Sequence, residues 1–231
     1  MSHRLLEICA YNIQSCNAAY QAGASRIELC SSPAEGGVTP GYGIVKHVID
    51  TIAITAYIMV RPRGGNFVYD QEELHIMHAD IRQLKSMGCP GVVVGPLTAD
   101  GRVNADELKR MTELAYPMQV TFHKAFDRVA EPFVALEQII AAGCHRILTS
   151  GLASTATEGT NVLQQLIQKA GDRIIIMPGG GVRSSNIRQL ADATGAVELH
   201  SSAILPGTTD NTSDIGEIKR LVEGLSAIPK G

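Results

Sequence analysis

Short apolar runs recur along the chain about every 27 residues, and each segment between them has room for one helix and two loops. The eight runs span residues 5–10, 26–31, 54–60, 92–97, 119–126, 146–151, 174–179 and 197–203. Strands that alternate with helix-length segments are typical of βαβ units in a parallel sheet. Eight such units predict an α/β fold, a single (β/α)8 barrel of the TIM type.

Residues typical of helix ends agree with this arrangement. Asp70 and Asn104 suit the N-cap position, and Pro132 suits the first turn of the helix that follows it. A glycine precedes four of the runs, where it suits the left-handed residue that ends a helix. These glycines are Gly23, Gly88, Gly143 and Gly171. Since no linker or low-complexity tract divides the 231 residues, we expect one domain over residues 1–231.

Composition argues against several classes of function. With a net charge of −3 and 4% aromatic residues, the chain lacks the basic surface and stacking platforms of nucleic-acid-binding proteins. No apolar stretch reaches about 18 residues, and residues 1–7 lack the apolar core of a signal peptide. We therefore expect a cytoplasmic protein without membrane association. Five cysteines, an odd number, argue against a disulfide framework.

The polar residues of the runs gather on one face. Side chains alternate along a strand, so Glu7 and Cys9 share a face, while Leu6 and Ile8 occupy the face that packs against helices. The same count predicts the side chains that point into the barrel: Glu7, Cys9, Glu28, Cys30, Met59, Arg61, Thr121, His123, Glu198 and His200. Asp127 follows just beyond the fifth run. Functional residues of such barrels lie at the C-terminal ends of the strands, so we expect the site there.

Two interpretations of this inward set remain open. One is a satisfied ion-pair network, with Arg61 paired most simply to a glutamate, because charges are almost never buried without partners. The other, which we favour, is a ligand site, since ionised groups are a costly way to stabilise a barrel. The acid–base and charge-bearing candidates are Glu7, Glu28, Arg61, His123, Asp127 and His200. Lys124 alternates with His123 and should face the helices, which argues against a Schiff-base enzyme.

Cys9 and Cys30 occupy matching positions on neighbouring predicted strands. Strands lie about 4.8 Å apart, so two inward thiolates can approach twice a metal–sulfur distance of about 2.3 Å. Soft thiolates favour soft ions such as Cu(I). The alternatives are two unreacted core thiols or an occasional disulfide. We expect Cys16, Cys89 and Cys144 to be structural.

Two loops near the C-terminus suit an anion. Glycine-rich turns expose backbone N–H groups, and many barrels bind phosphate at the loops after the seventh and eighth strands. The candidates here are Gly179, Gly180, Gly181, Ser201 and Ser202. The alternative is a tight turn that needs positive φ. The loop over residues 61–70 could act as a lid, and its Arg63 is a further candidate for holding an anion.

The chain resembles the CutC copper homeostasis family over nearly its whole length. The shared segments are Leu-Glu-Ile-Cys at 6–9, Arg-Ile-Glu-Leu-Cys at 26–30, Glu-Gly-Gly-Val-Thr-Pro at 35–40, Arg-Pro-Arg-Gly-Gly at 61–65, Thr-Phe-His-Lys-Ala-Phe-Asp at 121–127, Leu-Thr-Ser-Gly at 148–151 and Glu-Leu-His-Ser-Ser at 198–202. The resemblance implies a cytoplasmic TIM-type barrel, often a homodimer, that handles copper. It also implies Cu(I) binding by the cysteines that match Cys9 and Cys30.

These observations leave two hypotheses for function. The first is a copper homeostasis protein that binds Cu(I) through Cys9 and Cys30 at the barrel mouth. The second is an acid–base enzyme (a lyase, isomerase or hydrolase) acting on a small anionic or phosphorylated substrate, which Arg61 or Arg63 would hold. The second hypothesis arises because a copper carrier has no evident need for the carboxylates and imidazoles, and hard carboxylates are poor Cu(I) ligands.

Overall fold

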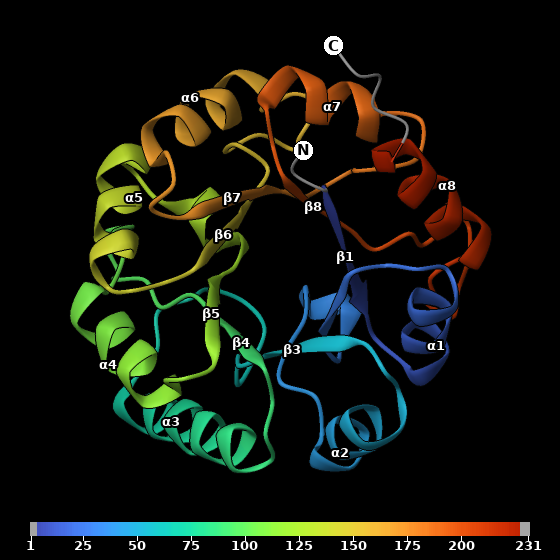
Figure 1. Ribbon diagram of the computed structural model, residues 1–231. Helices are drawn as coiled ribbons and strands as arrows, with labels where there is room; N and C mark the ends of the chain where they lie inside the picture. Colours follow the sequence, from blue (N-terminus) through green and yellow to red (C-terminus); the bar gives the residue numbers. More distant parts are fainter. Residues whose placement is uncertain (1–3, 227–231) are drawn as a thin grey trace.

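The computed structural model describes residues 4–226, in which eight parallel strands form a ring inside a layer of helices (Figure 1). The strands are β1 (Leu5–Ala10), β2 (Arg26–Leu29), β3 (Thr55–Met59), β4 (Gly91–Val94), β5 (Gln119–Phe122), β6 (Arg146–Thr149), β7 (Ile175–Pro178) and β8 (Glu198–Ser201). The α-helices are α1 (Ile13–Gln21), α2 (Tyr42–Thr51), α3 (Gln71–Ser86), α4 (Ala105–Ala115), α5 (Pro132–Ala141), α6 (Thr160–Ala170), α7 (Ile187–Thr194) and α8 (Ile215–Ser226). The predicted TIM-type barrel is confirmed.

Neighbouring strands pair in sequence order from β1 to β7, and β8 pairs with β1. In the described part of the chain, β7 and β8 are joined by one bridge, between Gly179 and His200. Register places Glu7 beside Arg26 of β2 and beside His200 of β8. Side chains of equal parity on these three strands therefore meet inside the barrel.

The helices begin and end where the local chemistry predicts. Asp70 caps α3 with a complete capping box, in which its side chain accepts from the Glu73 amide and the Glu73 side chain accepts from the Asp70 amide. Asn104 caps α4 by accepting a hydrogen bond from the Glu107 amide, and Pro132 stands in the first turn of α5. Among residues 4–226, no helix is both long and apolar enough to cross a membrane.

Most strands end earlier than the apolar runs predicted. The clearest difference is β5, which ends at Phe122, because a short 3-10 helix (η2, Lys124–Arg128) starts directly after it. His123 caps η2 by accepting a hydrogen bond from the Ala125 amide. The prediction extended to residue 126 because Ala125 and Phe126 are apolar, and both are buried in the core. Burial thus continues after strand pairing has stopped.

The outward faces of the strands form the hydrophobic core with the helices. Ile8, Ile27, Ile58 and Phe122 are fully buried there. Their inward neighbours are polar or sulfur-bearing, so the barrel has an apolar outer layer and a chemically reactive interior. The interior is the place to look for function.

Candidate functional site

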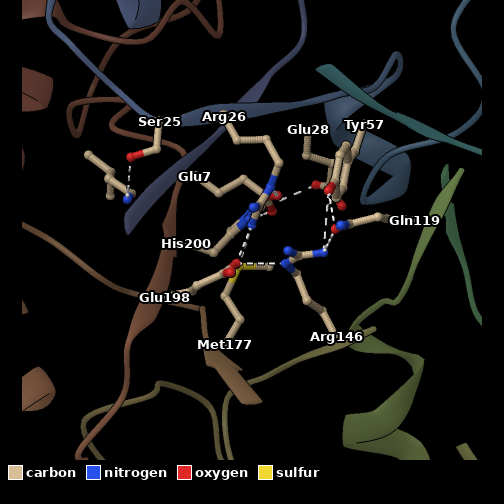
Figure 2. Close-up of polar contacts among 11 residues, drawn as sticks. Glu7, Ser25, Arg26, Glu28, Tyr57, Gln119, Arg146, Met177, Glu198 and His200 are labelled. Atoms are coloured by element: carbon tan, nitrogen blue, oxygen red, sulfur yellow. Dashed lines mark hydrogen bonds and ion pairs between the residues drawn. The ribbon is translucent and has the colours of Figure 1, made fainter. Parts of the chain in front are cut away.

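Two buried arginines form ion pairs inside the barrel (Figure 2). Arg26 donates to Glu7 through Nε and to Glu198 Oε2 through Nη2, the latter at 2.6 Å. Arg146 Nε donates to the same Glu198 oxygen at 2.7 Å. The ion-pair alternative is therefore correct for Glu7 and Glu198, and this inner charged layer joins β1, β2, β6 and β8.

Tyr57 lies beside both guanidinium groups. Its ring centroid is 4.7 Å from Cζ of Arg26 and 5.3 Å from Cζ of Arg146, which are cation–π distances. The hydroxyl donates to Oε1 of Gln119 at 2.5 Å. Sequence analysis did not select Arg26, Arg146 or Tyr57. Strand parity would have found two of them, since Arg26 has the parity of Glu28 and Tyr57 that of Met59.

His200 connects the inner charged layer to the residues nearer the mouth. Its Nδ1 donates to Glu7 Oε1 at 2.8 Å, and its Nε2 lies 3.8 Å from Glu28 Oε2. Burial disfavours the imidazolium, but hydrogen bonds with Cys9 and Glu7 raise the pKa of His200 well above its usual value. Burial alone would raise the pKa of Glu7, yet His200 and Arg26 together lower it to about 2. His200 is therefore a buried cation.

Cys9, Glu28 and Cys30 form a buried cluster in which one ligand atom of each lies within 4.8 Å of the others. Hydrogen bonding from Cys30 lowers the pKa of Cys9 well below its usual value, against the effect of burial. Burial and the neighbouring Cys9 raise the pKa values of Glu28 and Cys30. The cluster thus contains one thiolate, with a thiol and a carboxylic acid beside it. Glu28 Oε1 is buried without a hydrogen-bond partner among the described residues.

The cluster opens on a cavity of about 100 Å³ at the C-terminal mouth of the barrel. The cavity is lined by Cys9, Tyr11, Glu28, Gly36, Met59, Arg61, Phe67, His123, Lys124, Leu148 and His200. Besides Met59, five of the residues that strand parity predicted to point inward share this cavity: Cys9, Glu28, Arg61, His123 and His200. Cys30 adjoins it through the cluster.

Arg61 has no glutamate partner among the described residues, so the expected ion pair with a glutamate is wrong. Its guanidinium donates to three backbone carbonyls, those of Glu35 at 2.6 Å, Gly37 at 2.8 Å and Gly65 at 2.9 Å. These carbonyls belong to the loops after β2 and β3, which fold back over the strand end. The two terminal nitrogens of Arg61 thus have acceptors, but none of these acceptors carries a negative charge.

His123 is a buried neutral imidazole on the opposite side of the barrel from β1. Burial, followed by the nearby positive charge of Arg61, lowers the pKa of His123 to about 3. Nδ1 accepts from the Ala125 amide at 3.1 Å, so the ring proton is on Nε2. Nε2 is buried and has no hydrogen-bond partner among the described residues.

A CutC family model matches residues 4–205. A CutC family protein of Chromobacterium violaceum is 48% identical over 200 residues, which are 87% of this chain and 81% of that protein. A copper homeostasis protein cutC homolog of Homo sapiens is 42% identical over 199 residues, which are 86% of this chain and 73% of that protein. The chain belongs to the CutC family.

Solved structures agree with this assignment. A CutC crystal structure from Streptococcus agalactiae superposes with a TM-score of 0.82 at 32% identity, and covers 86% of this chain and 98% of that one. N-(5'-phosphoribosyl)anthranilate isomerase from Pyrococcus furiosus superposes with a TM-score of 0.64 at 10% identity, over 98% of this chain and 100% of that one. The likeness to the isomerase concerns the barrel fold alone. The resemblance to the CutC family is confirmed.

In this CutC family member, the expectation that Lys124 faces the helices is wrong. Lys124 lines the cavity, and its Nζ lies 3.7 Å from Asp127 Oδ2. Strand alternation does not apply to it, because the chain leaves β5 at Phe122 and turns into η2. Strand alternation therefore does not exclude the Lys124 amine from the barrel mouth.

Asp127 holds the loop after β6 and is absent from the cavity lining. Its carboxylate accepts from the Ser150 amide at 3.0 Å, the Ser150 hydroxyl at 2.9 Å and the Leu152 amide at 3.1 Å. These bonds occupy both carboxylate oxygens. An acid–base role for Asp127 stays a prediction, and its contacts are those of a loop anchor.

The glycine turn after β7 packs closely against its neighbours. A Cβ on Gly179 would lie 2.4 Å from Leu148 Cδ1, and one on Gly180 would lie 3.1 Å from Lys124 Nζ. Gly180 and Gly181 have φ values of +102° and +70°. The turn therefore needs glycine for its backbone, as the alternative interpretation expected. An anion at these amides stays a prediction.

The other anion candidates bond to the protein itself. Ser201 Oγ donates to the Val182 carbonyl at 2.7 Å, and Ser202 Oγ accepts from the Ile204 amide at 3.5 Å. Arg63 forms an ion pair with Glu73 that ties the loop after β3 to the start of α3. None of the three is among the residues that line the cavity.

The remaining cysteines are free and buried away from the cavity. Cys16 lies on α1, and Cys89 and Cys144 precede β4 and β6. Burial raises the pKa of Cys89 to about 11 and that of Cys144 to about 12. All three pack in the hydrophobic core, as a structural role predicts.

Proposed function

We propose that this CutC family member binds Cu(I) between Cys9 and Cys30 at the C-terminal mouth of the barrel. The observation that carries the proposal is the buried cluster, whose sulfur and carboxylate atoms lie within 4.8 Å of one another. A two-coordinate ion with metal–sulfur distances of about 2.3 Å needs sulfurs about 4.6 Å apart. The two side chains can therefore span one ion with little movement.

The ionisation of the cluster supports the same ion. Hydrogen bonding lowers the pKa of Cys9, so one soft thiolate is present before the metal arrives. Cys30 keeps its proton until binding, because burial raises its pKa. Binding would release that proton, so affinity should rise with pH. The relatives from Mus musculus and Homo sapiens that are named copper homeostasis protein cutC homolog lend further support.

The test is a Cu(I) titration against a competing chelator under reducing conditions. The Cys9→Ser/Cys30→Ser variant should lose the tight site, while Cys16→Ser, which changes a buried thiol on α1, should keep it. Equal affinity in all three proteins would reject the proposal. Circular dichroism of each variant checks that the barrel has folded.

A second candidate function is acid–base catalysis on a small anionic substrate. It is favoured by the nearness of groups that can exchange protons, since the Cys9 thiolate lies beside the protonated Glu28 and the imidazolium of His200. The protein would be incubated with small carboxylates and carbonyl compounds in D2O. Incorporation of deuterium into one of these compounds that is lost in Glu28→Gln would support this function. Absence of incorporation into any of the compounds tested would reject it.

We also propose that the protein acts in the cytoplasm as a homodimer and binds neither nucleic acid nor membrane. The net charge of −3 supports the absence of nucleic-acid binding. Sedimentation at micromolar protein concentration tests the dimer, because a single species of monomer mass would exclude it.

A further inference from the structure

The charge of Arg61 is uncompensated within the cavity. Its side chain is buried, and the three groups that accept its hydrogen bonds are neutral carbonyls. Its Nε is buried without a hydrogen-bond partner among residues 4–226. A buried cation without a counter-ion is costly, so an arginine in this state is typical of a site that receives an anion.

The rest of the interior balances its own charges. The two guanidinium groups of the inner charged layer face the carboxylates of Glu7 and Glu198. His200 Nδ1 lies 2.8 Å from the Glu7 carboxylate. The cation of the cavity lining that has no carboxylate within ion-pair distance among the described residues is Arg61, and the half-exposed Lys124 lies at the rim beside Asp127.

His123 adds a directed donor to the same wall. The Ala125 amide occupies Nδ1, which leaves Nε2 as an N–H group. That N–H is buried and unpartnered in the described part of the chain. Phe67 packs against both residues, with its ring centroid 4.9 Å from the His123 ring and 4.8 Å from Arg61 Cζ. The cation and the donor thus contact the same aromatic ring and line the same cavity.

We propose that this wall of the cavity is a binding site for a small monocarboxylate. One carboxylate oxygen accepts the Nε2–H of His123, and the guanidinium of Arg61 neutralises the charge. A cavity of about 100 Å³ holds roughly the volume of three water molecules, which corresponds to an anion of about three or four heavy atoms. Acetate has this size. The site uses neither thiol, so it is independent of the proposed Cu(I) function.

The experiment titrates acetate into the full-length protein by calorimetry, and follows the ring nitrogens in a ¹⁵N-histidine-labelled sample. His123→Asn keeps an acceptor for the Ala125 amide but removes the Nε2 donor. Arg61→Gln removes the charge. The matched control is Arg63→Gln, on the same loop but outside the cavity lining. Benzoate, which exceeds the cavity, is the control for size.

Acetate should bind saturably to the native protein at millimolar concentration and shift one histidine Nε2 resonance. Its affinity should fall about tenfold or more in His123→Asn and in Arg61→Gln, since each loses a hydrogen bond or charge contact to an ion. Arg63→Gln should bind acetate as the native protein does. Absence of saturable binding, or unchanged affinity in both His123→Asn and Arg61→Gln, overturns the proposal. A native protein that binds acetate but not Cu(I) would reject the proposed copper function and support the carboxylate site.

Discussion

His200 Nδ1 lies 2.8 Å from Glu7 Oε1, and the other oxygen of that carboxylate accepts from Arg26. One buried carboxylate is therefore shared by two cations, Arg26 in the inner charged layer and His200 in the cavity lining. Its removal would leave both cations without that partner. Stability and the ionisation of the metal cluster should consequently depend on the same side chain.

Glu7→Gln tests this dependence. The substitution should lower the free energy of unfolding by about 3–5 kcal/mol, because it leaves buried charges unpaired. Urea unfolding followed by circular dichroism measures the change. The matched control is Glu137→Gln, which breaks a surface ion pair with Arg173. In that pair the Arg173 side chain is 48% exposed and the Glu137 side chain is 55% exposed. There we expect a loss of at most about 1 kcal/mol. Equal losses in the two variants would contradict the account of Glu7.

Folding of the barrel should depend on the absence of a side chain at Gly91. A Cβ at this position would lie 2.6 Å from the Tyr57 ring, which cannot move freely because it packs against Arg26 and Arg146. Gly91→Ala should therefore cost about 1–3 kcal/mol of unfolding free energy, the usual effect of overpacking.

Gly43→Ala is the control for Gly91→Ala. Gly43 lies in α2, and an added Cβ there meets nothing within 4 Å. This variant should be neutral or up to about 1 kcal/mol more stable, because alanine favours helix. Urea midpoints of the two variants give the comparison. A Gly91→Ala protein as stable as Gly43→Ala would show that the Tyr57 ring has room.

The pH dependence of stability should contain a contribution from His123. The pKa of this imidazole falls from 6.5 to about 3 on folding. Between these values the unfolded chain binds a proton that the folded protein does not, so stability decreases as the pH falls through this window. The slope from this group approaches about 1.4 kcal/mol per pH unit.

His123→Asn isolates that contribution. The unfolding free energy of this variant should depend less steeply on pH between about 6 and 4 than that of the native protein. Identical slopes in the two proteins would mean that His123 is protonated in the folded state, and the tautomer argument would then be wrong.

Asp127→Asn should act on the loop after β6. The carboxylate accepts two backbone amides and the Ser150 hydroxyl, so the amide substitution loses acceptor capacity and should cost about 1–3 kcal/mol. Cu(I) affinity should stay unchanged, because Asp127 does not line the cavity. Unfolding and chelator competition on one preparation measure both effects. Loss of Cu(I) binding in a folded variant would place Asp127 in the site.

Strand parity was enough to predict much of the site. Cys9, Glu28, His123 and His200 reach one cavity because each has inward parity at a strand end, and parity is a property of the backbone alone. The starts of the strands were predicted to within one residue from the starts of the apolar runs. Their ends were not, since an apolar run continues wherever the chain stays buried, as in Ala125 after β5.

The partners of the charged residues could not be predicted from local pattern. Arg61 bonds to carbonyls of two loops whose paths depend on the whole barrel. Glu198 meets Arg26 across 172 positions of sequence, and only closure of the ring brings them together. The orientation of Lys124 was predicted wrongly because side-chain alternation ends where the backbone turns into η2. Periodicity describes elements, whereas pairing depends on topology.

The seam between β7 and β8 has one backbone bridge in the described residues, at Gly179 and His200. Glu198 on β8 pairs with Arg146 of β6 and with Arg26 of β2. Side-chain ion pairs in the interior therefore connect strands across a seam that has few backbone hydrogen bonds. Amide exchange at residues 198–201 should consequently quicken when either arginine is replaced by methionine. Ion pairs in the interior therefore hold the strands on each side of this seam. Through Arg26 and Glu7 the same network reaches His200, whose imidazole lies beside the thiols.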